Sequence, residues 1–259
     1  MDPAGRHIVI TGAASGIGRA CALAFADAGA TVTASDVNLA GAEATGLTAI
    51  AADVGREEQI EALIREAEDA NGPIDAFFSN AGITGASGGP PELTNLDWDV
   101  LWRVNVQSHV WAAKHLLPKM LERGDGYLLS TASAAGLLTQ LGALGYAATK
   151  HAAVAVAEWI DITYRDKGVR ASCLCPQFVN TPMVSEGLDV EKLRQIAEII
   201  EPEQVAQDVV QAFAEERFLI LPHEEVGRYM RNRGADHARW LDGMRRLQAQ
   251  LGGLERPRE

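Results

Sequence analysis

A glycine-rich turn between an apolar strand and a helix is the feature that most constrains how this chain can fold. Residues 7–11 read His-Ile-Val-Ile-Thr, a short run with β-branched side chains that is typical of a buried parallel strand. Residues 12–18 follow with the spacing Gly-x-x-x-Gly-x-Gly, and residues 19–28 then form an amphipathic stretch that stops at Gly29. Glycines let the backbone approach a pyrophosphate, and the free N–H groups of a helix end attract its negative charge. We therefore predict a nucleotide-binding turn here rather than a flexible loop.

Short apolar segments alternate with amphipathic segments along the rest of the chain. The expected strands are residues 30–36, 47–51, 75–79, 126–131, 169–175 and 218–221. The expected helices are residues 56–71, 96–123, 143–167 and 202–215. This alternation predicts an α/β fold, a Rossmann-type doubly wound parallel sheet of about seven strands with helices on both faces. We expect residues 1–259 to form one such domain, since no linker divides them.

An acidic residue, Asp36, ends the second expected strand. At this position a carboxylate can accept hydrogen bonds from the adenosine ribose hydroxyls, and it would repel a 2′-phosphate. No Lys or Arg lies between Ala13 and Ile17 or between Val37 and Ala44 to neutralise such a phosphate. The sequence therefore favours NAD over NADP as the cofactor, while a turn or cap role for Asp36 stays open.

Tyr146 and Lys150 lie one helical turn apart in the helix expected over residues 143–167. A phenol is a poor base near neutral pH, because its unperturbed pKa is about 10. An ammonium at i+4 lies on the same helix face and stabilises the phenolate. The spacing makes Tyr146 a candidate proton acceptor, although such a pair taken alone is more often two ordinary helix residues.

Charge and composition exclude several classes of function. The net charge of -12 argues against nucleic acid as a partner. We find no apolar run long enough to span a membrane and no signal-peptide pattern, so we expect no membrane partner and a cytoplasmic location. Cys21, Cys173 and Cys175 are an odd and sparse set, and a metal site would need more ligands. We expect buried free thiols and no metal.

Taken together and in this order, the motifs resemble those of the short-chain dehydrogenase/reductase family, in its common-length branch with a Tyr-x-x-x-Lys active site. The resemblance covers roughly residues 6–221. Residues 11–18 match the family's Thr-Gly-x-x-x-Gly-x-Gly turn, and residues 80–82 match its Asn-Ala-Gly segment, with Ser79 where Asn is common. Pro176 matches the proline after the sixth strand, but Gln177 stands where the family usually has glycine.

The resemblance implies four catalytic residues. Tyr146 would be the general base or acid, and Ser133 would hydrogen-bond the substrate oxygen. Lys150 would lower the pKa of Tyr146 and bind the nicotinamide ribose. Asn105 would hold a water of the proton relay through its backbone carbonyl. Structural alternatives stay open, because Ser133 could merely satisfy local backbone groups and Asn105 could be a buried helix residue.

The resemblance also implies an NAD site made of residues near the strand ends. Its expected members are Gly12, Ser15, Gly16, Ile17, Gly18, Asp36, Asp53, Val54, Asn80, Ala81, Gly82, Tyr146, Lys150, Pro176, Val179 and Thr181. Asp53 and Val54 would contact adenine, while Val179 and Thr181 would meet the nicotinamide carboxamide. Asn80 as a turn residue and Asp53 as a helix cap are the alternatives.

The expected substrate pocket is mostly apolar. Its candidate segments are residues 83–93, 137–144 and 183–200, and the middle segment carries Leu137, Leu138, Leu141 and Leu144 but no Arg or Lys. We therefore expect a hydrophobic secondary alcohol or its ketone as the small-molecule substrate. Gln177 either reaches this pocket or is exposed in its loop.

Residues 222–259 predict a helical C-terminal extension packed on the domain. Met244, Leu247 and Leu251 are spaced to form one helical stripe. A lid or a subunit contact is the alternative for this extension. The family resemblance implies a homodimer or homotetramer built mainly from the helices that contain Asn105 and Tyr146.

The combined prediction is an NAD-dependent oxidoreductase that interconverts a hydrophobic secondary alcohol and its ketone by hydride transfer. Two alternatives stay open. One is a ketone reductase in the cell, since sequence does not set the direction of the reaction. The other is a regulator that binds NAD without turnover, which has no need for the intact set Ser133, Tyr146 and Lys150.

Overall fold

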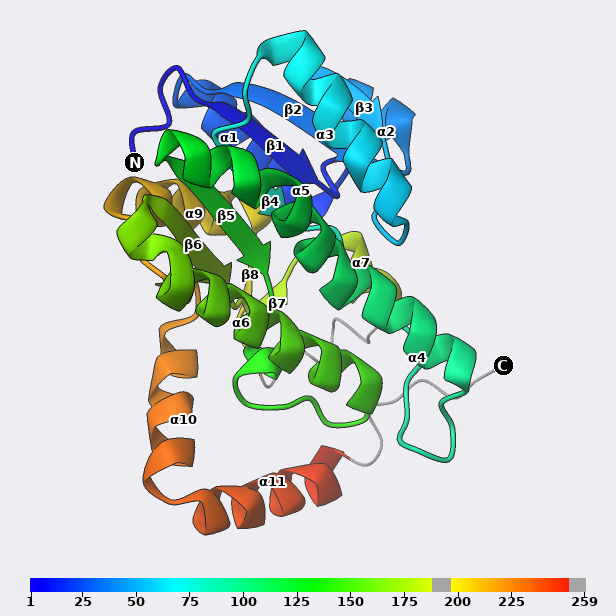
Figure 1. The fold of residues 1–259 in the computed structure, drawn as a ribbon. Helices are drawn as coiled ribbons and strands as arrows, with labels where there is room; N and C mark the ends of the chain where they lie inside the picture. Colours follow the sequence, from blue (N-terminus) through cyan, green and yellow to red (C-terminus); the bar gives the residue numbers. More distant parts are fainter. Residues whose placement is uncertain (188–196, 252–259) are drawn as a thin grey trace.

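Seven parallel strands form one sheet through the middle of the molecule (Figure 1). The structure is a computed structural model that describes residues 1–187 and 197–251. Within these residues the sheet contains β1 (His7–Thr11), β2 (Thr31–Asp36), β3 (Thr48–Ala51), β4 (Ala76–Ser79), β5 (Gly126–Thr131), β6 (Val169–Leu174) and β9 (Leu219–Ile220). The strand order is β3-β2-β1-β4-β5-β6-β9, so the winding reverses between β1 and β4. The predicted doubly wound α/β sheet in a single domain is confirmed.

Helices cover both faces of this sheet (Figure 1). One face carries α1 (Gly16–Asp27) and α9 (Pro202–Glu215), and the other carries α3 (Glu57–Asn71), α5 (Ser108–Arg123) and α6 (Leu144–Tyr164). Successive side chains of β1 serve the two faces in turn, because Ile8 and Ile10 belong to the core under α1 whereas Val9 belongs to the core under α3. Burial on both faces is the reason that the strands are continuous apolar runs.

The long helix expected over residues 96–123 is divided in the structure. It consists of α4 (Asn95–Trp102), a π-helical turn (Arg103–Gln107) and α5. A π-turn closes its hydrogen bonds one residue later than an α-helix, and the hydropathy pattern carries no signal of that change. The single-helix prediction is therefore wrong at its centre.

Several short elements were not predicted, because a few residues do not establish a hydropathy period. They are α2 (Leu39–Glu43), α7 (Pro182–Gly187) and the strand pair β7 (Phe178–Val179) and β8 (Ile199–Ile200). Residues 188–196 of the expected substrate segment and residues 252–259 of the expected extension lie outside the described residues.

After β9, the helices α10 (Glu224–Ala235) and α11 (His237–Leu251) form an arm that leads away from the sheet (Figure 1). Val226 is buried at the base of α10, whereas no described residue of α11 is buried. Of the expected apolar stripe on α11, Met244 is half-buried and Leu247 is 40% exposed. The side chain of Leu251 lies outside the described part of the chain.

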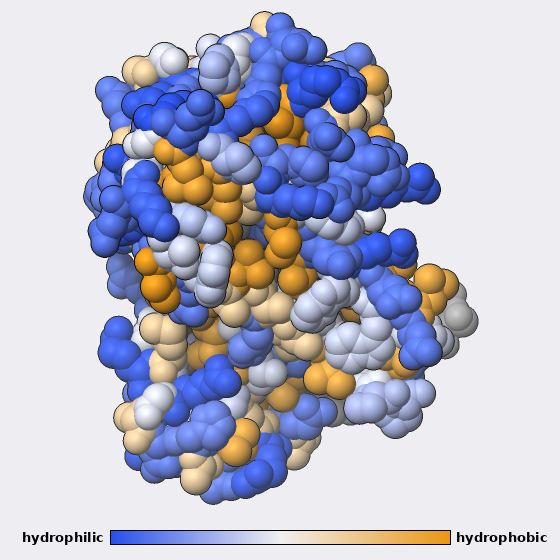
Figure 2. Space-filling view, viewed as in Figure 1, coloured by the Kyte–Doolittle hydropathy of each residue, from blue (hydrophilic) through white to orange (hydrophobic). Residues whose placement is uncertain are grey.

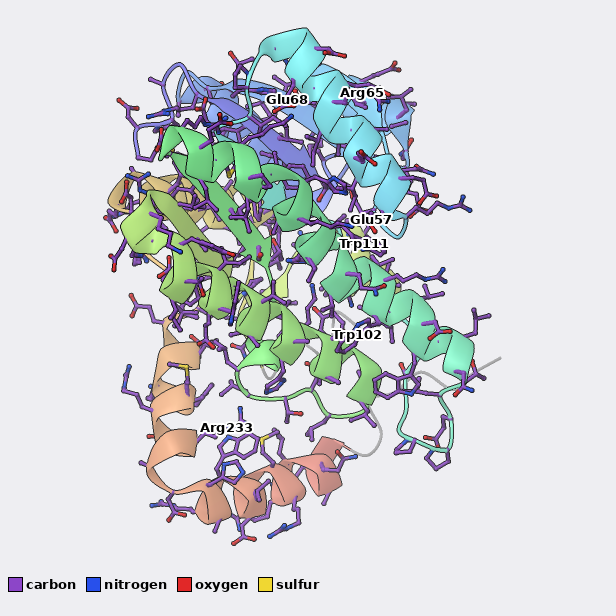
Figure 3. All side chains as sticks on the ribbon, in the orientation of Figure 1. Glu57, Arg65, Glu68, Trp102, Trp111 and Arg233 are labelled. Carbon is purple, nitrogen blue, oxygen red and sulfur yellow. The ribbon has the colours of Figure 1, made fainter. Side chains whose placement is uncertain are left out.

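Arg233 holds the corner of this arm, between α10 and α11 (Figure 3). Its guanidinium lies over the Trp240 ring, 5.1 Å from the ring centroid. The same group donates a hydrogen bond to the carbonyl oxygen of Leu137, in the loop before α6. Arg233 is thus the described link between the arm and the segment that precedes Tyr146.

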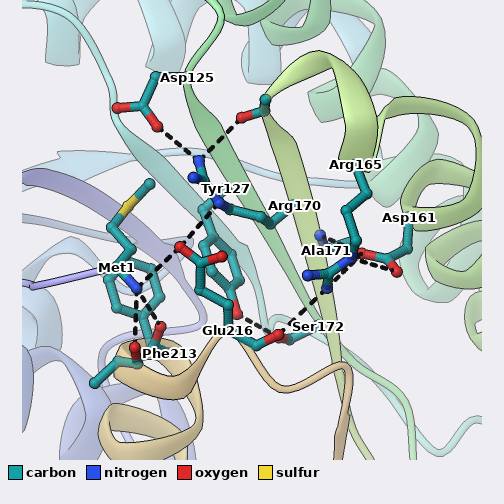
Figure 4. Close-up of polar contacts among 12 residues, drawn as sticks. Met1, Asp125, Tyr127, Asp161, Arg165, Arg170, Ala171, Ser172, Phe213 and Glu216 are labelled. Carbon is teal, nitrogen blue, oxygen red and sulfur yellow. Dashed lines mark hydrogen bonds and ion pairs between the residues drawn. The ribbon is translucent and has the colours of Figure 1, made fainter.

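A polar network joins the amino ends of β5 and β6 to the end of α9 (Figure 4). Arg170 forms ion pairs with Asp125 at 2.8 Å and with Glu216 at 2.9 Å. The Tyr127 hydroxyl lies 2.6 Å from the Ser172 hydroxyl, and burial raises the pKa of Tyr127 to about 12. Each ion pair is partly solvated and contributes roughly 0.2–1 kcal/mol, so the network aligns strand ends more than it stabilises the fold.

The glycine-rich turn leads to a prediction about stability. An added Cβ at Gly18 would lie 2.1 Å from the Gly12 carbonyl oxygen and 2.5 Å from Asn80 Nδ2. We expect Gly18→Ala to lower the free energy of unfolding by roughly 1–3 kcal/mol, because backbone must move to relieve the overlap. Urea unfolding followed by circular dichroism measures this change.

Gly243 provides the matched control for this substitution. A Cβ at Gly243, on α11, would meet no atom within 4 Å. We expect Gly243→Ala to raise the free energy of unfolding by about 0.4–1 kcal/mol, since alanine restricts the unfolded chain and favours helix. Equal effects of the two substitutions would contradict the close packing of the turn.

Candidate active site

A cavity of about 530 Å³ opens at the carboxyl ends of the strands, where the strand order reverses. All but one of the predicted site residues line it: Gly12, Ser15, Gly16, Ile17, Gly18, Asp36, Asp53, Val54, Asn80, Ala81, Gly82, Ser133, Tyr146, Lys150, Pro176, Val179 and Thr181. The exception is Asn105, which is fully buried behind the wall. The fold therefore brings together residues that come from the whole length of the chain.

One wall of the cavity is the glycine-rich turn between β1 and α1. Gly12 has a φ of +69°, and a Cβ there would lie 2.9 Å from the Ala81 Cα. Asp36 fixes the shape of this wall, because its Oδ2 accepts a hydrogen bond from the Ala14 N–H at 3.0 Å and its Oδ1 accepts one from the Asn38 N–H at 2.9 Å. Asp36 therefore acts as a turn residue and also faces the cavity, so both roles considered for it are compatible.

Asn80 connects three strand ends at the back of the cavity. Its Nδ2 donates to the Thr11 carbonyl oxygen at 3.0 Å, and its Oδ1 accepts from the Thr131 hydroxyl at 2.9 Å. The Thr11 hydroxyl in turn accepts from the Asn80 and Ala81 N–H groups, both at 3.1 Å. The amide side chain thus ties β1, β4 and β5 together and has a structural use besides facing the cavity.

Tyr146 and Lys150 lie on the first two turns of α6. Lys150 is 3% exposed, and its ammonium donates a hydrogen bond to the Thr131 carbonyl oxygen at 2.9 Å. It lies 5.7 Å from the centroid of the Tyr146 ring. The i+4 spacing therefore places the two side chains next to each other, as predicted from helix geometry.

Ser133 follows β5 and caps the short 3₁₀ turn Ala134–Gly136. Its Oγ accepts a hydrogen bond from the Ala135 N–H at 3.1 Å and contacts the Pro176 carbonyl oxygen at 3.5 Å. Ser133 is buried but lines the cavity on the side of Tyr146. The bond from the Ala135 N–H holds the side chain in place and uses the hydroxyl only as an acceptor. The hydroxyl donor is only weakly engaged, because its contact with the Pro176 carbonyl oxygen is 3.5 Å, which is long for an O–H···O bond.

Burial governs the titration of the Tyr146 and Lys150 pair. It raises the pKa of Tyr146 above its ordinary value, and the Ser133 hydroxyl opposes that rise. Burial also lowers the pKa of Lys150 to about 8. The expected lowering of the Tyr146 pKa by Lys150 does not appear among the protein groups alone, because loss of solvent is the largest influence and Ser133 is the group that opposes it.

Asn105 occupies the π-helical turn behind this pair. Its Oδ1 accepts from the Ile83 N–H at 2.9 Å, and its Nδ2 donates to the Ile83 carbonyl oxygen at 2.9 Å. The same Nδ2 contacts the Thr149 hydroxyl at 3.2 Å. The side chain is thus a structural joint between the loop after β4 and α6, and only the backbone carbonyl is left for the predicted relay role.

Asp53 follows β3 and organises its own loop. Its Oδ1 accepts a hydrogen bond from the Gly55 N–H at 2.9 Å, and its Oδ2 lies 3.5 Å from Arg56 Nε. Val54 is buried beside it. Asp53 is therefore a loop residue and not the cap of α3, whose N-cap is Arg56, and it lines the cavity as well.

Gln177, the departure from the family pattern, lines the cavity beyond Pro176. Its backbone N–H donates to Nδ1 of His223 at 3.2 Å. His223 is 2% exposed and stands at the start of α10, so it joins the loop after β6 to the base of the arm. Sequence reasoning missed His223, because a lone histidine after the last strand carries no periodic or spacing signal.

The part of the cavity next to Tyr146 has walls from three segments. They contribute Ile83, Thr84, Gly85 and Ser87, then Gln140 and Ala143, and then Phe178, Met183 and Val184. The expected leucines of residues 137–144 do not line it, since Leu137 packs with Val154 in the core and Leu144 is 39% exposed. The polarity of this middle wall was thus predicted wrongly, because loop residues have no period that tells which side chain turns inward.

Residues 1–187 and 197–251 contain neither a cluster of metal ligands nor a membrane-spanning helix. No group of three or more His, Cys, Asp or Glu residues there is arranged to hold a metal ion. No helix in the same part of the chain is long and apolar enough to cross a membrane. Cys21, Cys173 and Cys175 are buried free thiols, as expected.

Comparison with known proteins places these features in context. The family profile described as short chain dehydrogenase matches residues 6–191. A 1-deoxy-11-beta-hydroxypentalenate dehydrogenase from Streptomyces exfoliatus is 37% identical over 238 residues, which cover 85% of this chain and 84% of the relative. A cyclohexanol dehydrogenase from an Acinetobacter species is 34% identical over 212 residues, which cover 78% of this chain and 84% of the relative. The crystal structure of a short chain dehydrogenase/reductase from Burkholderia phymatum in complex with NAD has a TM-score of 0.79 and 31% identity, covering 91% of this chain and 95% of its own.

The burial of Lys150 leads to a prediction about pH. Its pKa is lowered to about 8 in the folded protein, whereas an unfolded lysine titrates near 10.4. Between these values the unfolded chain binds more protons, so the contribution of Lys150 to stability rises with pH. We expect the difference in unfolding free energy between the parent and Lys150→Met to change in favour of the parent by up to about 1.4 kcal/mol per pH unit above pH 8. Urea unfolding of both proteins from pH 7 to pH 9.5 measures it, and a difference independent of pH would contradict the shift.

Proposed function

This chain belongs to the short-chain dehydrogenase family, and on that premise we propose that it is an NAD-dependent oxidoreductase interconverting a hydrophobic secondary alcohol and its ketone. Membership makes it an oxidoreductase of alcohols or ketones that uses a nicotinamide cofactor. The observation that carries the proposal is the meeting of the glycine-rich turn with Ser133, Tyr146 and Lys150 in one cavity. A nucleotide-binding turn and a proton-transfer group thereby face the same space.

The residues of the turn fit a dinucleotide. Gly12 and Gly18 let the turn pack closely on its surroundings, since an added Cβ at either position would overlap protein atoms. The first turn of α1 begins at this turn, so its free N–H groups lie beside the cavity. We propose that Gly12, Ser15, Gly16, Ile17 and Gly18 hold the pyrophosphate. Asp36 supports NAD over NADP, because its carboxylate faces the cavity and would repel a 2′-phosphate. The complex of the Burkholderia phymatum relative with NAD supports the same cofactor.

The remaining predicted residues are proposed to hold the two ends of the cofactor. Asp53 and Val54 would lie at adenine, and Asn80, Ala81 and Gly82 along the middle. Pro176, Val179 and Thr181 would lie at the nicotinamide. All of them line the cavity on the expected side of the sheet.

The nicotinamide ring, when bound, accepts or delivers the hydride, and the protein handles the proton. In the oxidising direction we propose that Tyr146 accepts the proton of the substrate hydroxyl as its phenolate. Ser133 hydrogen-bonds the same oxygen and orients it. Lys150 stabilises the phenolate by its charge, and Asn105 keeps Ile83 and the helix of Tyr146 in register.

The Tyr146 phenolate requires a charge besides Lys150. Burial raises the pKa of Tyr146, so the protein alone disfavours the ionised form. Lowering a tyrosine pKa from about 10 to about 7.5 takes roughly 3.4 kcal/mol. The positive ring of an oxidised nicotinamide, together with the Lys150 ammonium, is of the right sign and strength to supply this in a partly dry cavity.

The walls near Tyr146 support a hydrophobic substrate. Ile83, Phe178, Met183 and Val184 contribute apolar surface, while Gln140 and Gln177 provide amides. Lys150 is the one cationic side chain among the described lining residues. The cyclohexanol dehydrogenase among the relatives, by its name, acts on an apolar alcohol, which supports this substrate class.

We further propose that two or four copies of the chain assemble through α5 and α6. Apolar side chains reach the surface over these helices (Figure 2), and they include Trp159, which is 58% exposed, and Ile162, which is 84% exposed. Trp102 and Trp111 lie along the same side of α4 and α5 (Figure 3). Burial of such a patch between copies would remove large apolar surfaces from water.

The catalytic role of Tyr146 is tested by Tyr146→Phe. We expect kcat to fall by about 10²–10⁴-fold, since the variant lacks the proton acceptor, while NAD binding is kept. NADH absorbance with a panel of hydrophobic secondary alcohols measures the rate, and NAD titration by calorimetry measures binding. Tyr164→Phe, near the other end of α6, is the matched control and should keep the parent rate. Undiminished turnover in Tyr146→Phe would overturn the role of Tyr146 as proton acceptor, whereas a parent that binds NAD but turns over no alcohol would favour the regulator.

The role of Asp36 is tested by Asp36→Asn. This variant loses the negative charge but keeps an oxygen for one of the two loop hydrogen bonds. We expect the ratio of kcat/KM with NAD to that with NADP to fall about tenfold, equivalent to about 1.4 kcal/mol of discrimination. Parallel assays with the two cofactors measure the ratio. A parent enzyme that prefers NADP would overturn the assignment.

A further inference from the structure

His223 is a buried histidine whose ring makes one hydrogen bond within the described part of the chain. It is 2% exposed, and its Nδ1 accepts the backbone N–H of Gln177 at 3.2 Å. Its Nε2 is buried and has no partner among residues 1–187 and 197–251. A ring nitrogen that accepts a hydrogen bond carries no proton, so the proton of the neutral ring is on Nε2. Because an unpaired buried N–H is unfavourable, the bond to Gln177 is the polar contribution that this ring makes.

The bond from Gln177 to His223 fixes one side of a peptide group whose other side reaches Ser133. The carbonyl oxygen of the same peptide group, which belongs to Pro176, accepts the Ala134 N–H at 2.8 Å and contacts Ser133 Oγ at 3.5 Å. A peptide group is planar, so hydrogen bonds at both its N–H and its C=O hold its orientation. The backbone of Gln177 is therefore fixed relative to Ser133.

The side chain of Gln177 carries an amide that is free to bind a ligand. Gln177 lines the cavity, and its amide forms no hydrogen bond with any residue in the described ranges. Phe178, Met183 and Val184 line the same cavity with apolar side chains. Small-molecule sites are mostly apolar and carry a few polar groups that set orientation and specificity. An amide offers one acceptor and two donors, so it suits a hydroxyl or a carbonyl oxygen.

We propose that Gln177 hydrogen-bonds a second oxygen of the substrate and that His223 is the positioning residue for Gln177. This inference rests on the proposed function, in which Ser133 and Tyr146 hold the reacting oxygen. Because one peptide group links the positions of Ser133 and Gln177, the two oxygens of a preferred substrate have a set spacing. The substrate class is thus a secondary alcohol or ketone that carries a further hydroxyl or carbonyl group.

The first test compares cyclohexanol with the three positional isomers of cyclohexanediol, each with NAD. In a purely apolar cavity the added hydroxyl would lose water without gaining a partner, so cyclohexanol would be the better substrate. We expect the parent instead to prefer one of the diols by about tenfold in kcat/KM, the effect of one hydrogen bond. We expect this ratio to fall to about one or below in Gln177→Met, which keeps the side-chain length without the amide. A parent that prefers no diol, or a Gln177→Met variant that keeps the parent ratio, would overturn the proposal.

Gln140→Met is the matched control, because Gln140 is the other glutamine among the described lining residues. His223 has no described hydrogen bond to the Gln140 loop, so we expect the preference for the diol to remain in this variant. A preference that is lost in Gln140→Met and kept in Gln177→Met would assign the second oxygen to Gln140 and contradict the proposal.

The role of His223 is tested by His223→Leu and His223→Asn. Leucine fills the site without an acceptor, whereas the side-chain oxygen of asparagine can accept the Gln177 N–H in place of Nδ1. We expect His223→Leu to lower the ratio of diol to cyclohexanol kcat/KM about threefold and His223→Asn to restore most of it. A merely structural role would affect both substrates alike, so an unchanged ratio in His223→Leu would contradict the positioning role. Gln177→Met decides the proposal if His223→Leu does not fold.

Binding of the same alcohols gives a readout that does not depend on turnover. An alcohol cannot react with NADH, because the reduced cofactor does not accept a hydride. We expect ligand-observed NMR titration in the presence of NADH to give a Kd for the preferred diol about tenfold below that of cyclohexanol, and the difference to disappear in Gln177→Met. If the parent oxidises none of the alcohols, the proposed function fails, while the titration still decides this inference. Equal or absent binding of all four alcohols would overturn it.

Discussion

The hydrogen bonds of the Asn80 side chain set the geometry on which the cavity depends. The amide bridges the Thr11 carbonyl at the end of β1 and the Thr131 hydroxyl at the end of β5. A parallel sheet spreads apart at the point where its winding reverses, and a single short amide spans that point. Thr131 then offers its own carbonyl to Lys150. Thr131 thus links the Lys150 ammonium to the Asn80 side chain that bridges the strand ends.

The same burial that positions the ionisable groups also works against their ionised forms. Lys150 is held by a carbonyl dipole in a nearly closed site, and its pKa falls to about 8. Burial raises the pKa of Tyr146 beside it and so favours the neutral phenol. In the proposed mechanism, the charge of the bound cofactor would offset this effect of burial, so that the Tyr146 phenolate would form where the hydride acceptor is present.

Much of the fold and of the cavity lining was predictable, for physical reasons that differ from residue to residue. Ile8, Val9 and Ile10 are buried on two faces, which forces an apolar run that sequence displays openly. Turn glycines are equally visible, because a Cβ at Gly18 has no room. Gln140 and His223 were not predictable, since one depends on which way a loop side chain turns and the other on a contact across 46 positions of the chain. Sequence patterns reveal constraints set by neighbouring residues in the chain, and the positions of Gln140 and His223 are not set by such neighbours.

The π-helical turn Arg103–Gln107 has a consequence for the whole of α5. Each residue advances a helix by about 100° of rotation, so one extra residue in a turn redirects every side chain that follows it. With the turn in place, Asn105 and His109 are buried while Val110 is 43% exposed. A relative lacking one of these five residues would rotate the buried and exposed sides of the helix against each other. An insertion or deletion here would therefore be poorly tolerated, because the buried side of the helix, with Asn105 and His109, and its exposed side, with Val110, would turn together.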